Sequence, residues 1–454
     1  MEIEEFEMKL RGKLVQTGDE NYDEARKVHN AMIDKRPSLI AYCNDVADVI
    51  TSVNFTRENN LLTAIRGGGH NGGGLGICDD GLVIDLSNMK GIRIDPEERT
   101  AQVEGGCRWG DVDHATHAFG MATPSGIIST TGVGGLTLGG GLGHLSRKYG
   151  LSIDNLLSAD MVLADGRFVT VSENNHPDLF WAIRGGGGNF GVVTSFKFRL
   201  HPVSTIIGGP TLWQLGKARD VMKWYRDFIV NAPEDLSGFF AFLTVPPAPP
   251  FPEKLHMQKM CGIVWCYTGP TDQAEEIFRP VREFGPPDLY GIHDMPFPAL
   301  QSAFDALYPP GMQWYWRADF VNELSDEAIE QHLKFAKAPT MHSTMHLYPI
   351  DGTAHRIRNN DTAFNYREAN WSQVIVGVDP DPANKEQITN WTKQYFDALH
   401  PYSAGGAYVN FMMDEGGDRI KATYRDNYKR LVDVKNKYDP NNLFRVNQNI
   451  KPTV

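Results

Sequence analysis

Residues 65–71 read IRGGGHN, three glycines that run directly into a histidine. The apolar segment LLTAI, residues 61–65, leads into them. Glycine weakens both helices and strands, so this run indicates a special backbone shape, a close approach to another group, or an ordinary flexible loop. The rest of the chain has to decide between these readings.

Glycine crowds into four runs, all in the first half of the chain: 67–76, 105–110, 132–143 and 185–191. Strand-like segments flank these runs, at 82–87, 99–106, 161–171 and 192–200. Short amphipathic segments at 45–59 and 108–120 predict helices between them. This mixture predicts an α+β domain over about residues 30–205, with glycine turns that let backbone N–H groups approach a ligand.

The second half changes character after HPVST at 201–205. Strands are predicted at 239–245, 257–269, 312–321 and 345–355, and a further one in REANWSQVIVGV, 367–378. Helices are predicted at 217–230, 271–284, 325–337 and 384–399. Elements of this size predict a sheet covered by helices on one face, with the other face free to line a pocket. The last stretch, 425–450, predicts a helix followed by a polar turn.

The composition excludes several classes of protein. The 454 residues are 41% hydrophobic and 22% charged, as in soluble enzymes, and the net charge of -12 argues against a nucleic-acid partner. No segment resembles a membrane span, and the acidic N-terminus lacks the apolar core of a secretion signal, so we expect a cytoplasmic protein. The five cysteines form no close-spaced framework, and we expect reduced thiols.

Two common phosphate motifs do not fit the glycine runs. A dinucleotide fingerprint needs G-x-G-x-x-G between a strand and a helix, whereas RGGGHNGGG leads into another strand. The run at 132–143 is too rich in glycine to predict a helix start, and no Gly-Lys-Ser/Thr ends any run. A large phosphate-bearing ligand bound by another route is therefore expected.

Taken together, three glycine-rich segments and the tail resemble a known family. RGGGH at 66–70, residues 125–155 and residues 178–196 resemble the FAD-binding domain of the vanillyl-alcohol-oxidase superfamily. The tail, from YVNFMMDEG at 408–416 to NQNI at 447–450, is similar to the berberine-bridge-enzyme-like branch. The resemblance implies an α+β fold with an FAD-binding domain of two α/β subdomains at 1–205. It also implies a substrate domain with an antiparallel sheet backed by helices at 206–410, and a C-terminal segment at 411–454 that returns to the FAD domain.

The resemblance also implies the cofactor and its attachment. In many members the histidine of this motif is bonded to the 8α-methyl group of FAD, and His70 holds that position. Some members add a second tether from a cysteine, but Ile128 stands at that position, so a single tether is expected. Phosphate contact by His144 is weighed against an exposed loop position. The expected FAD-binding residues are Arg66, Gly67, Gly68, Gly69, His70, Asn71, Ser125, Gly126, Thr130, Thr131, Gly134, Gly135, Gly139, Gly140, Gly141, Gly143, Tyr149, Gly150, Gly191, Val192, Val193, Asn447 and Asn449.

The implied reaction is hydride removal from a carbon that bears a hydroxyl or amine in a small metabolite. Reduced FAD would then pass its electrons to O2, giving hydrogen peroxide, and Thr131 would lie where a small side chain admits O2. The alternatives are a dehydrogenase with another acceptor and a flavin-carrying binding protein without turnover. Neither the substrate nor the oligomeric state follows from the sequence.

Candidate catalytic residues come from the second half of the chain. Tyr408 is the first candidate for base or proton relay, with Asn410 on the same face if that segment is an extended strand. Gln373 is a candidate for orienting the substrate, ahead of Glu368. The alternating aromatic residues at 314–316 predict one set in the core and one in a pocket, which favours a flat or aromatic substrate. No acidic residue completes a metal site around the histidines, so no metal is expected.

Overall fold

The segment that ends in the first glycine run is a strand of a small sheet. In the computed structural model, which describes residues 2–454, strands β3 and β4 pair in parallel, with Thr63 opposite Leu82. The strand order is β1-β2-β4-β3. The run at 67–76 therefore starts at the C-terminal end of a parallel strand, where open α/β sheets place their ligands. The four strands are β1 (Lys13–Gln16), β2 (Leu39–Tyr42), β3 (Thr63–Arg66) and β4 (Leu82–Asp85).

A second, antiparallel sheet carries the next glycine runs. Its order is β5-β6-β10-β8-β9, and Phe196 in its central strand pairs with Val103 on one side and Ala159 on the other. A short pair, β7 (Met121–Ala122) and β11 (His201–Pro202), lies beside it. The five strands are β5 (Ile92–Asp95), β6 (Thr100–Glu104), β8 (Leu156–Val162), β9 (Phe168–Ser172) and β10 (Val192–Arg199).

Short helices connect the strands of these two sheets. The prediction that the run at 132–143 cannot begin a helix is wrong, because Val133–Leu138 forms helix α5 with Gly132 at its N-cap. The helix is tolerated because Val133, Thr137 and Leu138 bury one side of it. The helices of this half are α1 (Ile3–Lys9), α2 (Tyr22–Ala25), α3 (Val46–Glu58), α4 (Trp109–His117), α5, α6 (Ser146–Tyr149) and α7 (Pro177–Ile183).

A large antiparallel sheet dominates the second half of the chain. Its eight strands run in the order β15-β12-β14-β13-β18-β19-β17, with β16 paired to β12. The predicted strands of this half are confirmed, including the one that contains both Cys261 and Cys266, but the strand expected at 345–355 ends at Pro349 and gives way to a 3-10 helix at Gly352–Arg356. The strands are β12 (Thr205–Gln214), β13 (Leu236–Thr244), β14 (Lys259–Tyr267), β15 (Leu289–Tyr290), β16 (His293–Pro296), β17 (Gln313–Val321), β18 (Thr344–Pro349) and β19 (Trp371–Asp379).

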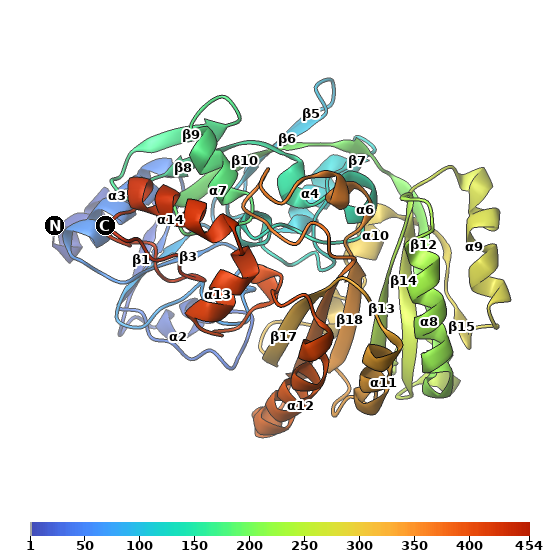
Figure 1. Cartoon of the computed structure of the whole chain (residues 1–454). Helices are drawn as coiled ribbons and strands as arrows, with labels where there is room; N and C mark the ends of the chain where they lie inside the picture. The colour runs from blue at the N-terminus through green and yellow to red at the C-terminus, as the bar shows by residue number, and fades with distance from the viewer. Residues whose placement is uncertain (1) are drawn as a thin grey trace.

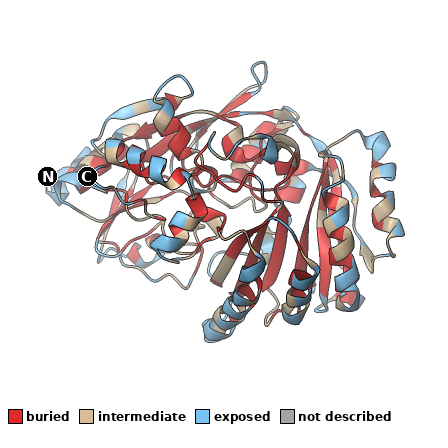
Figure 2. Ribbon diagram, viewed as in Figure 1, coloured by how far each residue is buried: buried red, intermediate tan, exposed pale blue. Residues whose placement is uncertain are grey.

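Helices cover one face of the large sheet, as predicted. Figure 1 shows α8, α11 and α12 lined up along the sheet, and Figure 2 shows their exposed outer sides over buried strands. Alternate strand residues such as Trp265 and Ile375 join a core with these helices, whereas Val374 and Val376 join the core on the other face. The helices of this half are α8 (Ala218–Ile229), α9 (Ala274–Glu283), α10 (Phe297–Gln301), α11 (Asp326–Phe335) and α12 (Lys385–Leu399).

The C-terminal segment returns across the first two sheets, so both termini lie at the same end of the molecule (Figure 1). Helices α13 (Gly417–Tyr424) and α14 (Asn427–Tyr438) lead into the final turn. Buried Lys435 holds this turn, because its ammonium donates to the carbonyls of Asn189 at 2.7 Å and Phe444 at 3.1 Å and pairs with Asp439. Among residues 2–454, no helix combines the length and apolar composition that a membrane span requires.

Single-turn 3-10 helices complete the connections. They are η1 (Ser152–Asp154), η2 (Leu215–Lys217), η3 (Glu253–Leu255), η4 (Thr271–Gln273), η5 (Asp305–Leu307), η6 (Gly352–Arg356), η7 (Pro382–Asn384), η8 (His400–Tyr402) and η9 (Val409–Phe411). The last of them borders the candidate site and corrects one of the sequence-based expectations.

Candidate active site

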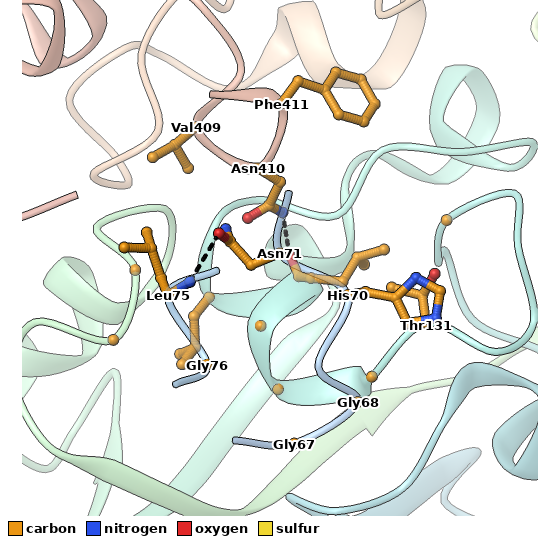
Figure 3. A pocket seen from close by; sticks show the side chains of 18 of the residues that line it. Gly67, Gly68, His70, Asn71, Leu75, Gly76, Thr131, Val409, Asn410 and Phe411 are labelled. Atoms are coloured by element: carbon orange, nitrogen blue, oxygen red, sulfur yellow. Dashed lines mark hydrogen bonds between the residues drawn. The ribbon is translucent and has the colours of Figure 1, made fainter. Parts of the chain in front are cut away.

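A cavity of about 310 Å³ lies between the glycine-rich loops and the uncovered face of the large sheet. Its lining comes from segments far apart in the chain, from His29 near the N-terminus to Gln448 near the C-terminus. Figure 3 shows the loop from Gly67 to Asn71 along one wall, with Val409–Phe411 facing it. The volume is within the range of cofactor and substrate pockets.

His70 lies on the cavity wall at the end of the first glycine run. Its Nε2 is 3.1 Å from the hydroxyl of Thr130, and its ring stacks on that of His29 with the centroids 4.0 Å apart. Burial, together with the nearby His29 and Arg108, lowers the pKa of His70 well below its usual value, so the imidazole is neutral. In the described chain no protein atom bonds to Nδ1, which leaves that ring nitrogen free to react.

The backbone before and after His70 is rich in unused donors. Five successive N–H groups, from Gly67 to Asn71, donate to no protein acceptor among residues 2–454. A side chain at Gly68 would collide with the backbone of Gly132, since a Cβ there would lie 2.4 Å from its nitrogen. These residues are half-buried on the cavity wall, and a ligand that covered them would have to accept their N–H groups, so the loop suits an acceptor-rich ligand.

About half of the predicted cofactor residues line the cavity. Arg66 is among them, and its guanidinium is paired with buried Asp85. Thr130 does not line the cavity itself but contacts His70. The predicted residues on the lining are Arg66, Gly67, Gly68, Gly69, His70, Asn71, Gly126, Thr131, Gly134, Gly135, Gly191, Val193 and Asn447.

The other predicted cofactor residues lie outside the lining. Tyr149 stacks on His201 at 3.9 Å, and a side chain at Gly150 would meet Asp154. Gly139 provides room for Asn410, Gly140 for Phe364 and Tyr408, and Gly141 for Ser152, so these glycines support the wall from behind. The remaining residues of this group are Ser125, Gly143, Val192 and Asn449, all packed against protein atoms.

His144 is neither exposed nor bonded to a partner. It is 5% exposed and its Nε2 is buried without a hydrogen-bond partner in the described residues. Burial lowers the pKa of His144 to about 3, so it is neutral. It does not line the cavity.

The segment around Tyr408 is not a strand, which corrects the expectation of an extended face. Tyr408 precedes the 3-10 turn η9, yet the two candidate side chains still meet, with Asn410 Nδ2 donating to the Tyr408 hydroxyl at 2.7 Å. The N–H of Gly141 donates to the same oxygen at 2.8 Å. Burial raises the pKa of Tyr408 to about 12, so it is a protonated phenol whose oxygen already accepts two hydrogen bonds.

Gln373 faces away from the cavity, which corrects its expected role beside the substrate. It lies on β19 with Trp371 and Ile375, on the face that the helices cover, and its side chain approaches His332 of α11. The neighbours Val374 and Val376 line the cavity in its place. Glu368 is outside the cavity too and pairs with Arg425.

The substrate side of the cavity is aromatic and carries no acidic group. Trp314 and Trp316 line it, whereas Tyr315 points to α12, where Lys393 lies over its ring, which confirms the predicted alternation. Tyr308 and Phe411 extend the same wall. Among residues 2–454, the lining contains no aspartate, glutamate or lysine, and its only permanent charge is the paired Arg66.

Sequence reasoning missed several lining residues. His29, Tyr308, His346 and Tyr348 stand in segments without a motif, and only the fold brings them to the cavity. Other omissions had a signal, because they lie in the glycine run at 185–191 or next to the predicted Asn447. These are Gly187, Gly188, Asn189 and Gln448.

The residues present fit the expected cofactor, FAD. Free backbone donors and side-chain-free loops suit a pyrophosphate, and the apolar strip from Leu136 to Val193 suits a flat ring system. Asn447 of the tail closes this side, since its amide donates to the carbonyl of Gly188 at 3.0 Å. The site is thus assembled from both ends of the chain.

Comparison with known proteins gives the same cofactor. Residues 37–172 match a family model described as FAD binding domain, and residues 407–451 match one described as berberine and berberine like. The chain is 33% identical over 456 residues to an FAD-linked oxidoreductase of Dictyostelium discoideum, which covers 99% of this chain and 97% of the relative.

A characterised oxidase is similar in both sequence and structure. The (R)-6-hydroxynicotine oxidase of Paenarthrobacter nicotinovorans is 28% identical over 470 residues, with 98% of each chain covered. The crystal structure of 6-hydroxy-D-nicotine oxidase from Arthrobacter nicotinovorans superposes with a TM-score of 0.87 at 26% identity, over 97% of this chain and 98% of that one. From the cavity, the two matched segments and the full-length similarity, the chain belongs to the berberine-bridge-like family of FAD-linked oxidoreductases.

Proposed function

We propose that this oxidoreductase is an oxidase of small, uncharged, flat metabolites, with FAD bonded covalently to His70. When bound, FAD supplies hydride acceptance from a carbon that bears a hydroxyl or amine, and electron transfer to O2. The chain's own residues hold the cofactor, orient the substrate and accept the proton of its hydroxyl or amine. Hydrogen peroxide is the expected second product.

The position of His70 is the observation that carries this proposal. A neutral imidazole is the nucleophilic form, and burial keeps His70 neutral. Its Nε2 contacts Thr130, so Nδ1 is the nitrogen available for the bond to FAD. The glycines before it remove side chains from the approach, which lets the loop lie directly against a ring edge.

The aromatic wall supports a flat and uncharged substrate. Trp314, Trp316 and Phe411 offer ring faces for stacking. A cationic amine would need a carboxylate partner, and the lining contributed by residues 2–454 has none. The ring faces on this wall favour a flat substrate over an aliphatic sugar. An aromatic alcohol, or an amine in its neutral form, suits this surface.

Tyr408, Asn410 and Thr131 have supporting roles in this proposal. The two hydrogen bonds accepted by the Tyr408 oxygen leave only its O–H proton, which has no protein acceptor in the described chain, so the phenol donates toward a ligand. Asn410 is fixed by its bond to the carbonyl of Leu136 at 2.9 Å. Thr131 is the small lining side chain that we assign to the path of O2.

The first experiment tests the attachment. Wild-type protein is precipitated in acid, and the pellet is expected to stay yellow and to fluoresce as a band on a denaturing gel. In His70→Ala the colour should pass to the supernatant, whereas His29→Ala, the histidine stacked 4.0 Å away, should keep it in the pellet. A colourless wild-type pellet, or a yellow His70→Ala pellet, would overturn the covalent assignment.

The second experiment tests the reaction. Aromatic alcohols and neutral amines are screened without oxygen for bleaching of the flavin band, and air is then admitted. One peroxide per bleaching cycle is the result expected of an oxidase. Bleaching that reverses only with an added dye would show a dehydrogenase, and failure of every alcohol and amine to bleach the band would contradict the proposed reaction.

A further inference from the structure

Strand β18 presents a histidine and a tyrosine side by side to the cavity. His346 and Tyr348 stand two residues apart, so they share one face of the strand, and both line the cavity. Nδ1 of His346 is 2.6 Å from the Tyr348 hydroxyl. The pair faces the glycine-rich loops from the substrate side.

The other ring nitrogen of His346 is open to the cavity. Its Nε2 has no protein partner among residues 2–454, and this atom remains accessible to solvent. Val374 pairs with His346 on β19, and the ring of Phe239 on β13 lies 4.9 Å away, so apolar side chains flank the imidazole. A ligand in the cavity would meet Nε2.

The groups around the pair keep it uncharged. Burial lowers the pKa of His346 to about 3 and raises that of Tyr348 well above 10, where the neighbouring Tyr308 adds to the effect. The titratable groups that face His346 are these two phenols, and no carboxylate or cation contributes to its pKa. The imidazole is therefore neutral at physiological pH and keeps a lone pair on Nε2. Because burial disfavours the imidazolium, the proton has to move together with the departure of the hydride rather than before it.

Tyr408 is less suited to this task. Its oxygen already accepts hydrogen bonds from Gly141 and Asn410, so what it can offer a ligand is its O–H proton and not a lone pair. His346, by contrast, lines the cavity from strand β18 and keeps a free lone pair on Nε2. Tyr408 is therefore suited to donate a hydrogen bond to the ligand, and His346 is suited to accept one.

We propose that His346 accepts the proton of the substrate hydroxyl or amine, held in the correct tautomer by Tyr348. This rests on the proposed function. The O–H or N–H bond breaks and its proton is bound by Nε2. The electron pair left behind forms the new C=O or C=N bond as a hydride leaves the same carbon. His346 thus takes the proton, whereas bound FAD would accept the hydride with its two electrons and later pass both electrons to O2.

Tyr348 acts as a positioning residue. If Nδ1 keeps its hydrogen and donates it to the Tyr348 oxygen, Nε2 carries the lone pair that faces the cavity. The hydrogen bond also stabilises the imidazolium formed during the step, because its N–H keeps an acceptor. Removing this hydroxyl should slow the reaction less than removing the imidazole.

The chain supplies a matched control for the pair. On the other face of the same sheet, Nδ1 of His332 is 2.7 Å from the hydroxyl of Tyr395, and burial lowers the pKa of His332 to about 3. Its Nε2, however, is sealed from solvent and lies outside the cavity. His332→Gln thus removes an imidazole with the same hydrogen-bond partner, but one that no ligand in the cavity can reach.

The kinetic test measures anaerobic flavin bleaching at saturating substrate. His346→Ala should lower the rate about 10²- to 10⁴-fold, as expected for loss of a general base, with little change in the half-saturating substrate concentration. Added imidazole should restore part of the rate in this variant only. His332→Gln should bleach at the wild-type rate, and Tyr348→Phe should fall between the two.

A binding test needs no turnover. In protein with ¹⁵N-labelled histidine, para-nitrophenol should shift one ring resonance that is absent from His346→Gln, and it should leave the resonance absent from His332→Gln unmoved. An unchanged bleaching rate in His346→Ala, or a phenol that shifts no His346 resonance, would overturn the proposal. A wild type that no substrate bleaches would instead contradict the proposed function, and the binding result would still decide whether Nε2 meets a ligand.

Discussion

A histidine and a tyrosine are hydrogen-bonded on each side of the large sheet: one pair on strand β18 faces the cavity, and the other joins helices α11 and α12 on the covered side. His346 bonds to Tyr348 on the cavity face at 2.6 Å, and His332 bonds to Tyr395 on the helix face at 2.7 Å. Burial lowers the pKa of both histidines to about 3. Only His346 leaves a ring nitrogen open to a ligand. The two histidines therefore differ in access to the cavity and not in basicity.

The largest expected difference between the faces lies in stability. Trp265 on the helix face is fully buried, and its indole N–H donates to Thr211 at 2.9 Å. Trp265→Ala should lower the free energy of unfolding by about 3–5 kcal/mol, as for other large core truncations. Trp316→Ala on the cavity face should lower it less and should weaken substrate binding instead. Urea unfolding measures the loss of stability, and the half-saturating substrate concentration measures the loss of binding. Equal losses of unfolding free energy in the two variants would contradict the expected difference between the faces.

Adjacent residues of β19 give a finer comparison. Ile375 packs under the helices and Val376 lines the cavity. Ile375→Ala should lower the free energy of unfolding by about 2–4 kcal/mol without altering substrate preference. Val376→Ala should have a smaller effect on unfolding and should change the relative rates for small and bulky alcohols. If Ile375→Ala shifted the substrate preference, the helix face would be coupled to the site.

The smallest expected effect concerns pH. A folded pKa of about 3 for His332, against about 6.5 when unfolded, means that the unfolded chain binds more protons between these values. The free energy of unfolding therefore falls as pH decreases from 6.5 toward 3, by about 2 kcal/mol at pH 5 for one such group. His332→Gln should flatten this dependence in urea titrations. A steeper dependence in the variant would show that His332 is charged in the folded protein.

Local motifs made much of the fold and part of the site predictable. The loop that ends in His70 is continuous in sequence, so its position on the cavity wall follows from one short segment. The helices over the large sheet were predictable from their apolar period, and both faces of that sheet were inferred correctly in outline. The domain limits at 205 and 410 stay a prediction.

The errors arose where a strand is buried on both sides. All nine residues of β19 are buried, so no alternation in the sequence tells which of Gln373 and Val374 faces the cavity. His346 was missed for a related reason, since its role depends on the face of β18 and on the register with β19. The segment at Tyr408 was misread as a strand, since its bonds to Gly141 and Leu136, which the sequence does not reveal, accompany a 3-10 turn.

The closing of the cavity by the tail has a consequence for biosynthesis. Asn447 and Gln448 are on the lining together with His29, more than four hundred positions apart along the chain. A ribosome must therefore release nearly the whole polypeptide before the prosthetic group can be enclosed. Proteolytic removal of residues 447–454 would take Asn447 and Gln448 from the lining and open this side of the cavity to solvent in a mature molecule.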